Sequence, residues 1–348
     1  MITETDDYFA HQIVEPHAHV LSNDPSWADR TYITMGDPDR FCMDIGISMY
    51  PNNNAMEAYA IAAVPDRQWS MRASRDLREG RHPLWAGPSR FAIIEPMKHW
   101  TMTCDENESG ISYELEFQSR GEPYEVRQPE VRKRGHLIHT DVYVFQPGQV
   151  SGVLRLDDQT FELDKIGAAR DRTWGLRHYG EGTLPHGVLA WLSVELEEYS
   201  IIAHIRDRAD EVPQVRGGAV YYPDGTTIPL VDFAHDLDFD YDSRQLIRGS
   251  LTLTDANGKV YDVDVDPTLR MHLSGAGYVT EPKRRRGRQG NSLWHERWDL
   301  TDPELVARVE GLNDNVGWIT VNDERGTGVL ETSLGEHDRY KAAPSQLT

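Results

Sequence analysis

Hydrophobic and polar residues alternate in short runs along most of the chain. This period of two is the pattern of a half-buried strand, and turn-forming residues separate the runs. The runs of the first half are 31–35, 41–50, 58–64, 69–73, 91–94, 100–103, 111–117, 137–145, 150–156 and 161–163. We expect tight turns at Gln146–Gln149 and Asp157–Thr160.

The second half continues the pattern as hairpins. The strand pairs are 188–196 with 199–206, 219–222 with 226–231, and 246–253 with 260–265. Only residues 302–311 read as a helix, because Asp302 can cap its start and Pro303 fits its first turn. The pattern therefore predicts an all-β protein with one short C-terminal helix.

One supersecondary unit occurs twice. Residues 152–164 and 249–264 each consist of a glycine, an alternating strand, an acidic turn and a return strand with an aromatic residue. A chain of 348 residues also suits two domains. We therefore expect two tandem antiparallel β-barrels: residues 1–185, which include an N-terminal arm, and residues 186–335, followed by a flexible tail at 336–348.

The composition of the chain limits the kinds of partner that the protein can bind. The net charge of −21 argues against nucleic acid and anionic membranes, and the basic run at 283–288 is expected to be a solvated loop. No apolar run approaches the roughly 18 residues of a membrane span, so we expect no membrane insertion and a cytoplasmic location. The sequence leaves room for a homodimer.

Residues 168–180 hold the densest group of functional side chains: Arg170, Asp171, Arg172, Trp174, Arg177, His178 and Tyr179. One interpretation is a structural plug, in which Asp171 bridges Arg172 or Arg177 while Trp174 closes a barrel end. In the other, Asp171 is catalytic and the neighbouring Arg172, Trp174, Arg177 and His178 bind substrate.

A second candidate lies on the run before the turn at 146–149. His139, Asp141 and Tyr143 share one face of a strand. If this face is interior, His139 and Asp141 can transfer a proton and Tyr143 can bind substrate. The alternative is an outward polar face.

A third candidate is the alternating run 294–298. Glu296 lies between Trp294 and Trp298 on one face, and an inward carboxyl group between two indoles would have a raised pKa and act as an acid. The alternative is that the indoles face the core and Glu296 pairs with an arginine of a neighbouring strand.

Motifs for other chemistry are missing from the sequence. It contains no GxSxG, no phosphate-binding glycine loop and no GxGxxG before a helix. His17 and His19, or the acids of 235–240, do not match a set of metal ligands. We expect neither a metal nor a cofactor.

Four segments together resemble a known superfamily: 47–51, 87–95, 150–152 and, most specifically, Arg170-Asp-Arg-Thr-Trp-Gly175. In this order they are similar to the two-domain lipocalin-like superfamily that includes the carotenoid 1,2-hydratases. The resemblance implies two lipocalin-like barrels with a hydrophobic pocket near their junction. It also implies activities such as hydration of isoprenoid double bonds or pericyclic ring closure, with the 170–175 motif at or beside the site.

These observations predict a cofactor-independent lyase or isomerase, of hydratase, dehydratase or cyclase type. Its substrate would be a hydrophobic small molecule such as a terpenoid, a steroid or an aromatic catabolite. Asp171, Glu296, His139 and Asp141 are the candidate catalytic groups, and Trp294 joins the substrate-binding set. The rival hypothesis is a non-catalytic carrier of an apolar ligand.

Overall fold

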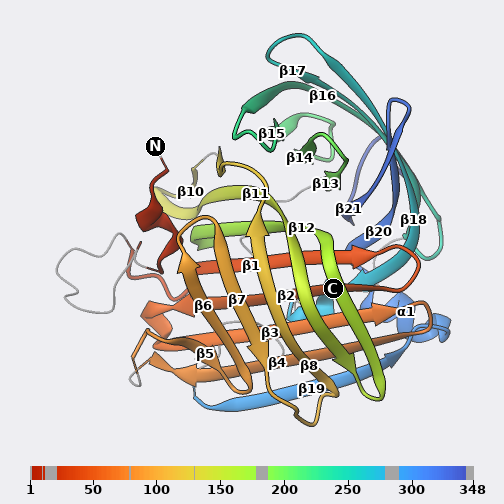
Figure 1. The fold of residues 1–348 in the computed structure, drawn as a ribbon. Coiled ribbons are helices and arrows are strands. Elements are labelled where there is room, and N and C mark those ends of the chain that lie inside the picture. Colours follow the sequence, from red (N-terminus) through yellow and green to blue (C-terminus); the bar gives the residue numbers. More distant parts are fainter. Residues whose placement is uncertain are drawn as a thin grey trace.

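The computed structural model describes residues 2–9, 11, 22–77, 80–128, 130–177, 187–278 and 290–341. The chain forms two curved β structures that pack against each other (Figure 1). Within the described residues α1 (Pro303–Val309) is the sole α-helix, and the side chain of Asp302 caps it by accepting from the Glu304 N–H. The predicted all-β fold of two barrels with one short helix is confirmed.

Thirteen antiparallel strands form the first sheet. They are β1 (Trp27–Asp37), β2 (Phe41–Tyr50), β3 (Ala55–Val64), β4 (Arg67–Asp76), β5 (Leu84–Ala86), β6 (Ser89–Glu95), β7 (His99–Cys104), β8 (Ile111–Ser119), β9 (Tyr124–Arg127), β10 (Val131–Lys133), β11 (His136–Leu156), β12 (Gln159–Arg177) and β19 (Ser292–Asp299). Their order is β19-β4-β3-β2-β1-β12-β11-β8-β7-β6-β5, and β9 and β10 pair with β11. The sheet curls around its own core, which includes Phe41, Trp69, Trp100 and Phe117, and β5 packs against β3. Among the described strands, however, no ladder joins β5 to β19.

The second sheet is a closed barrel. Its strands are β13 (Val188–Glu195), β14 (Ser200–Asp207), β15 (Pro213–Tyr221), β16 (Thr227–Phe239), β17 (Leu246–Asp255), β18 (Val260–His272), β20 (Leu312–Val321) and β21 (Glu324–Leu334). The 3-10 helices η1 (Glu4–Asp7), η3 (Pro51–Asn53) and η5 (Leu273–Ala276) lie outside the strands. Alternate residues such as Val194, Ile201 and Ile319 fill the barrel interior, as the period of two requires.

One strand crosses from the second half of the chain to the first sheet. β19 pairs with β4, so that Trp294 lies opposite Arg72 and Glu296 opposite Ser70. Figure 1 shows this blue strand beside orange β4. The domain limits at 185 and 335 stay predictions, because residues 178–186 lie outside the described part of the chain.

The predicted tight turn at Gln146–Gln149 is wrong, because β11 runs through it without a break. Before this point β11 pairs with β9, up to Phe145, and after it with β8, from Gly148. Pro147 lies where the partner strand changes, which is a place where its missing N–H removes no ladder bond. The motif at 168–177 is likewise continuous strand rather than a turn.

The two structures meet through their outer faces, in a layer that we call the junction. Tyr143 and Phe145 of β11 pack there against Trp191 and Ile202 of the second barrel. In another part of the junction, Cys42 of β2 and Ile61 of β3 pack against Met271 of β18 and Val316 of β20. The outer face of β1–β4 is therefore largely buried.

Both chain ends pack into a barrel. Asp7 and Phe9 of the N-terminal segment are fully buried in the first sheet. Tyr340 joins the core of the second barrel, and its hydroxyl lies 2.6 Å from Nδ1 of His235. The flexible tail at 336–348 stays a prediction, because residues 342–348 lie outside the described residues.

Candidate active site at the domain junction

Strand alternation divides the 170–175 motif between two faces of the first sheet. Arg170 lies opposite Ile33 of the core, so Arg170, Arg172 and Trp174 point into the first barrel. Asp171 and Thr173 point the other way, into the junction. The predicted bridge between Asp171 and Arg172 is therefore wrong, because adjacent residues of a strand face opposite sides. Arg172 pairs with Asp29 of β1 instead.

The other members of the motif cannot be placed. The side chain of Arg177 and residues His178 and Tyr179 lie outside the described part of the chain. The predicted bridge from Asp171 to Arg177 and the substrate-binding roles of Arg177 and His178 therefore stay predictions.

Four carboxyl groups surround Tyr32 in the junction. Asp171 lies opposite Tyr32 in the pairing of β12 with β1, and Asp44 of β2 lies opposite Thr34. The second barrel contributes Asp314 of β20 and Glu331 of β21, which are cross-strand partners. Several negative groups thus share one buried layer.

Asp44 and Asp314 form a carboxyl pair, which we call the dyad. They hydrogen-bond to each other, and the Thr34 hydroxyl donates to Asp314 Oδ2 at 3.1 Å. Both are buried, with relative exposures of 1% and 0%. Among the described residues, Oδ1 of each has no hydrogen-bond partner.

Burial keeps a proton on this dyad. Burial, and secondly the charge of Asp314, raise the pKa of Asp44 well above its usual value. Burial raises the pKa of Asp314 to about 6, although its hydrogen bonds with Asp44 and Thr34 oppose this. Two adjacent carboxyl groups that cannot both ionise hold one proton between them near neutral pH, as in aspartic proteases.

Tyr32 supplies a neutral phenol beside the dyad. Burial raises its pKa well above the usual value, and the negative charges of Glu331, Asp171 and Asp314 add to this. Tyr32 and Glu331 are half-buried, so solvent reaches them although the dyad is enclosed. The ring of Trp191 lies 6.2 Å from that of Tyr32 and 5.7 Å from that of Phe145. The arrangement combines a protonated acid with aromatic faces.

His139, Asp141 and Tyr143 share a face, as predicted, but this face is the junction rather than the interior of a barrel. Asp141 accepts from Arg30 Nη2 at 3.3 Å, and His139 Nε2 lies 4.0 Å from Asp141 Oδ2 and 2.8 Å from Gln128 Oε1. The face points outward, yet the second barrel buries it. The strand pairing places Tyr143 opposite Thr173, close to Asp171.

Glu296 and Trp294 lie elsewhere. They are half-buried on the outer face of β19, and Trp298 Nε1 donates to Glu296 Oε2 at 2.6 Å. The interpretation with Glu296 facing a barrel interior is therefore wrong. β19 is five strands from β12 in the sheet order, roughly 24 Å along the sheet at 4.8 Å per strand. The structure does not bring Glu296 together with Asp171.

Tyr32, Asp44, Asp314 and Glu331 were not predicted from the sequence. Asp44 carried a usable signal, because it is the only charged residue in the run 41–50, where both faces are buried. An acid in such a run must be desolvated on either face. Asp314 had no comparable signal, because it lies between two asparagines at the start of a strand.

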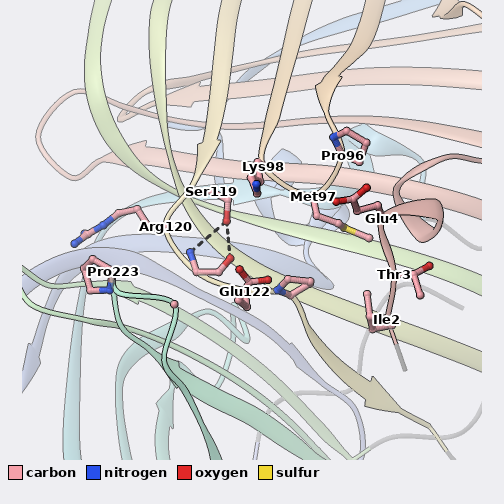
Figure 2. A pocket seen from close by; sticks show the side chains of 13 residues that line it. Ile2, Thr3, Glu4, Pro96, Met97, Lys98, Ser119, Arg120, Glu122 and Pro223 are labelled. Atoms are coloured by element: carbon pink, nitrogen blue, oxygen red, sulfur yellow. Dashed lines mark hydrogen bonds between the residues drawn. The ribbon is translucent and has the colours of Figure 1, made fainter.

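A cavity of about 550 Å³ lies at the rim between the two structures (Figure 2). Its lining residues are Ile2, Thr3, Glu4, Pro96, Met97, Lys98, Ser119, Arg120, Gly121, Glu122, Pro123, Pro223 and Gly225. In Figure 2, Ser119 donates to the Gly121 carbonyl at 2.6 Å and accepts from the Gly121 N–H at 3.2 Å. The dyad is not among the residues that line this cavity.

Neither a metal centre nor a membrane helix is found in the described residues. No group of three or more histidine, cysteine, aspartate or glutamate side chains there is placed to hold a metal ion. In those same ranges, every helix is too short or too polar to span a bilayer.

The fold and the junction define an all-β protein of two packed β structures with a buried carboxyl pair. The chain belongs to a family whose model matches residues 2–340 and whose description is "family of unknown function (DUF8625)". No curated protein matches the chain.

Solved structures share this fold at low sequence identity. An AttH-like protein from Nitrosomonas europaea is 11% identical, with a TM-score of 0.55, over 92% of this chain and 98% of that one. CghA, solved with Sch210972, is 11% identical, with a TM-score of 0.52, over 89% of each chain. Kievitone hydratase from Nectria haematococca is 12% identical over 93% and 96%, but we draw nothing from its TM-score of 0.44. The AttH-like protein and CghA confirm the predicted fold.

Proposed function

We propose that the protein is a cofactor-independent lyase or isomerase, of hydratase, dehydratase or cyclase type, with its acid/base centre at the junction. The observation that carries this proposal is the Asp44–Asp314 dyad, a buried acid that holds its proton near neutral pH beside Tyr32. A buried like-charge pair lowers stability, so a protein that retains one generally uses it. CghA, which shares the fold, was solved with a ligand, which supports a small-molecule function.

In this proposal the dyad gives its proton to a carbon of a substrate double bond or to a leaving hydroxyl. The cation that forms is stabilised by the aromatic faces of Trp191 and Phe145 and by the negative charge left on the dyad. The dyad then regains a proton, from an attacking water in a hydration or from a neighbouring C–H bond in an elimination or isomerisation. No redox partner is needed.

The remaining junction residues have supporting roles. Asp171 orients the phenol of Tyr32, which lies opposite it across the strands. His139 and Asp141, held by Arg30, provide a second proton-transfer pair, and Tyr143 contacts the substrate body. The substrate is an apolar alkene or alcohol, such as a terpenoid, a steroid or an aromatic catabolite.

The test uses the full chain and a panel of isoprenoid alkenes, sterols and phenolic alkenes in D₂O. Mass spectrometry reports gain or loss of water and deuterium on carbon. We expect turnover of at least one class, and we expect Asp314→Asn to lower the rate by about 10²–10⁴-fold, which is the usual effect of removing a positioned acid. Asp236→Asn, at an exposed carboxylate of β16, is the matched control and keeps full activity.

The carrier hypothesis predicts a different result from the same panel. A carrier binds one class of compound and returns it unchanged, without deuterium on carbon. Native mass spectrometry of the same mixtures detects such binding. Full turnover by a folded Asp314→Asn variant would also overturn the role of the dyad.

A further inference from the structure

The interior of the first barrel contains a second arrangement, separate from the dyad and on the opposite face of the sheet. Three donors surround the carboxylate of Asp7: the Met97 N–H at 2.7 Å, the Trp100 Nε1–H at 2.8 Å and the guanidinium of Arg170. Asp7 and Arg170 are 0% and 1% exposed. Each carboxylate oxygen receives at least one donor.

Groups of the barrel itself hold these donors in place. The guanidinium of Arg170 donates to Thr31 Oγ1 at 3.2 Å and to Gln146 Oε1 at 3.3 Å, and it lies 4.4 Å from the ring centroid of Trp100. The carboxylate, in contrast, comes from η1, a separate segment at the start of the chain. The barrel therefore presents a built receptor, and the N-terminal segment fills it.

The segment that carries Asp7 also adjoins open space. Met97, whose N–H binds Asp7, lines the 550 Å³ cavity of Figure 2, together with Thr3 and Glu4 of the N-terminal segment. Figure 2 shows Glu4 beside Met97, with Thr3 further along the N-terminal segment. Met97 thus belongs both to the receptor and to the wall of a cavity that is large enough for the body of a small organic acid.

We propose that the donors of Met97, Trp100 and Arg170 form a carboxylate-binding site, which Asp7 occupies as a tethered ligand. Free monocarboxylic acids bind there when the tethered carboxylate is removed. We expect anionic ligands, because Arg170 is a buried cation that needs a negative partner. Tethering gives Asp7 an effective concentration in the millimolar range or above, so it outcompetes dilute acids in the intact chain.

The test is chemical rescue of full-length Asp7→Ala. In sodium chloride we expect its melting temperature to fall by roughly 5–10 °C, because Arg170 loses its counter-ion. Sodium formate and sodium acetate at equal ionic strength should restore part of this loss in a saturable way. Acetamide, which is neutral and of similar shape, should not. If Asp7→Ala does not fold in chloride, the refolding yield in acetate against acetamide replaces the melting temperature.

Two variants make the result specific. Asp157 accepts from Trp69 Nε1 at 2.8 Å and from Arg297 at 2.7 Å. Like Asp7, it is thus a carboxylate held by an indole and a guanidinium, but its side chain is 34% exposed. Asp157→Ala should show no rescue by acetate, because water replaces the lost carboxylate. Asp7→Ala combined with Arg170→Gln should lose the preference for acetate over acetamide. Equal effects of acetate on Asp7→Ala, Asp157→Ala and the wild type would overturn the proposal.

Discussion

Two buried carboxylates on opposite faces of the first sheet, Asp7 and Asp44, have opposite environments. On its inner face Asp7 meets a cation and two N–H donors, so its charge is compensated. On its outer face Asp44 meets Asp314, an acid like itself, and each keeps one oxygen without a partner among the described residues. The three acids are buried to the same degree, because the relative exposure of each is at most 1%.

This difference separates a structural use of charge from a chemical one. A compensated pair fixes a segment in place, which suits the attachment of the N-terminal segment. An uncompensated pair gains a proton near neutral pH and can release it to another molecule. Burial alone therefore does not single out a candidate for acid catalysis, whereas burial without a counter-charge does.

The largest effect is expected when the uncompensated pair is removed. Asp44→Asn and Asp314→Asn should each lower turnover by about 10²–10⁴-fold, and the double variant should lose little more, because the two groups act as one acid. Rates on a substrate found in the D₂O panel measure this. Strictly multiplicative losses would show that the acids act independently.

The next effect concerns the compensated pair. Arg170→Met leaves the Asp7 carboxylate buried without a cation and should lower the free energy of unfolding by about 3–5 kcal/mol. Arg170→Met combined with Asp7→Leu should recover most of this loss, because both charges are gone. Urea unfolding measures both variants. Equal stability of the single and the double variant would show that the buried carboxylate of Asp7 does not need a cation beside it.

The two environments also predict a pH dependence. The pKa of Asp314 rises from its ordinary 3.8 to about 6 on folding, so the folded protein keeps a proton that the unfolded chain has lost. Stability contributed by this group is therefore lost as the pH rises from about 4 to 6, by roughly 3 kcal/mol at most. Asp314→Asn lacks this loss and should be the more stable protein at pH 7.5.

Urea unfolding of both proteins at several pH values checks this sign. Buried groups that do not interact with Asp314 cancel in the difference between the two curves. Asp44 belongs to the measured effect, because Asp314→Asn removes the charge that helps to raise the pKa of Asp44. Burial raises the pKa of Glu310 to about 7 and lowers that of His272 to about 4, but both proteins contain these groups. Parallel pH curves for wild type and Asp314→Asn would mean that folding does not shift the pKa of Asp314.

The smallest effect is expected at Glu296. This carboxylate is half-buried and accepts from Trp298 Nε1, so it resembles neither of the two buried pairs. Glu296→Gln keeps an oxygen acceptor for the indole and should change stability by about 0.5 kcal/mol or less and activity by less than about twofold. Thermal melts and rates on the same substrate measure it. A large loss of activity in the folded variant would move the catalytic centre to β19.

The alternation of residues predicted the fold well because it records which face of each strand is buried. It failed at Gln146–Gln149, where Pro147 and Gly148 suggested a turn, because the missing N–H of a proline is harmless where a strand changes its partner. The site was predicted in part. Asp171 of β12 and His139, Asp141 and Tyr143 of β11 do lie in the junction, because alternation along these two paired strands puts them on one face.

The dyad itself could not be predicted. Its members are brought together by the packing of two sheets and lie on β2 and β20, far apart in the sequence. Local patterns describe one strand at a time, so they give no register between faces that touch only after folding. The same reason explains why Arg172 was expected to pair with its neighbour Asp171 rather than with Asp29 across the sheet.

The pairing of β19 with β4 has a consequence for synthesis on the ribosome. β4 ends at Asp76, but the strand that covers its free edge begins at Ser292. At roughly 5–20 residues per second, this edge waits about 10–40 seconds for its partner. During that time its backbone N–H and C=O groups are open to other nascent chains, as at any bare sheet edge. A strand from the second half of the chain thus covers an edge of a sheet that is translated earlier. A chain that ends before residue 292 lacks β19, so the edge of its first sheet at β4 stays open to pairing with other chains.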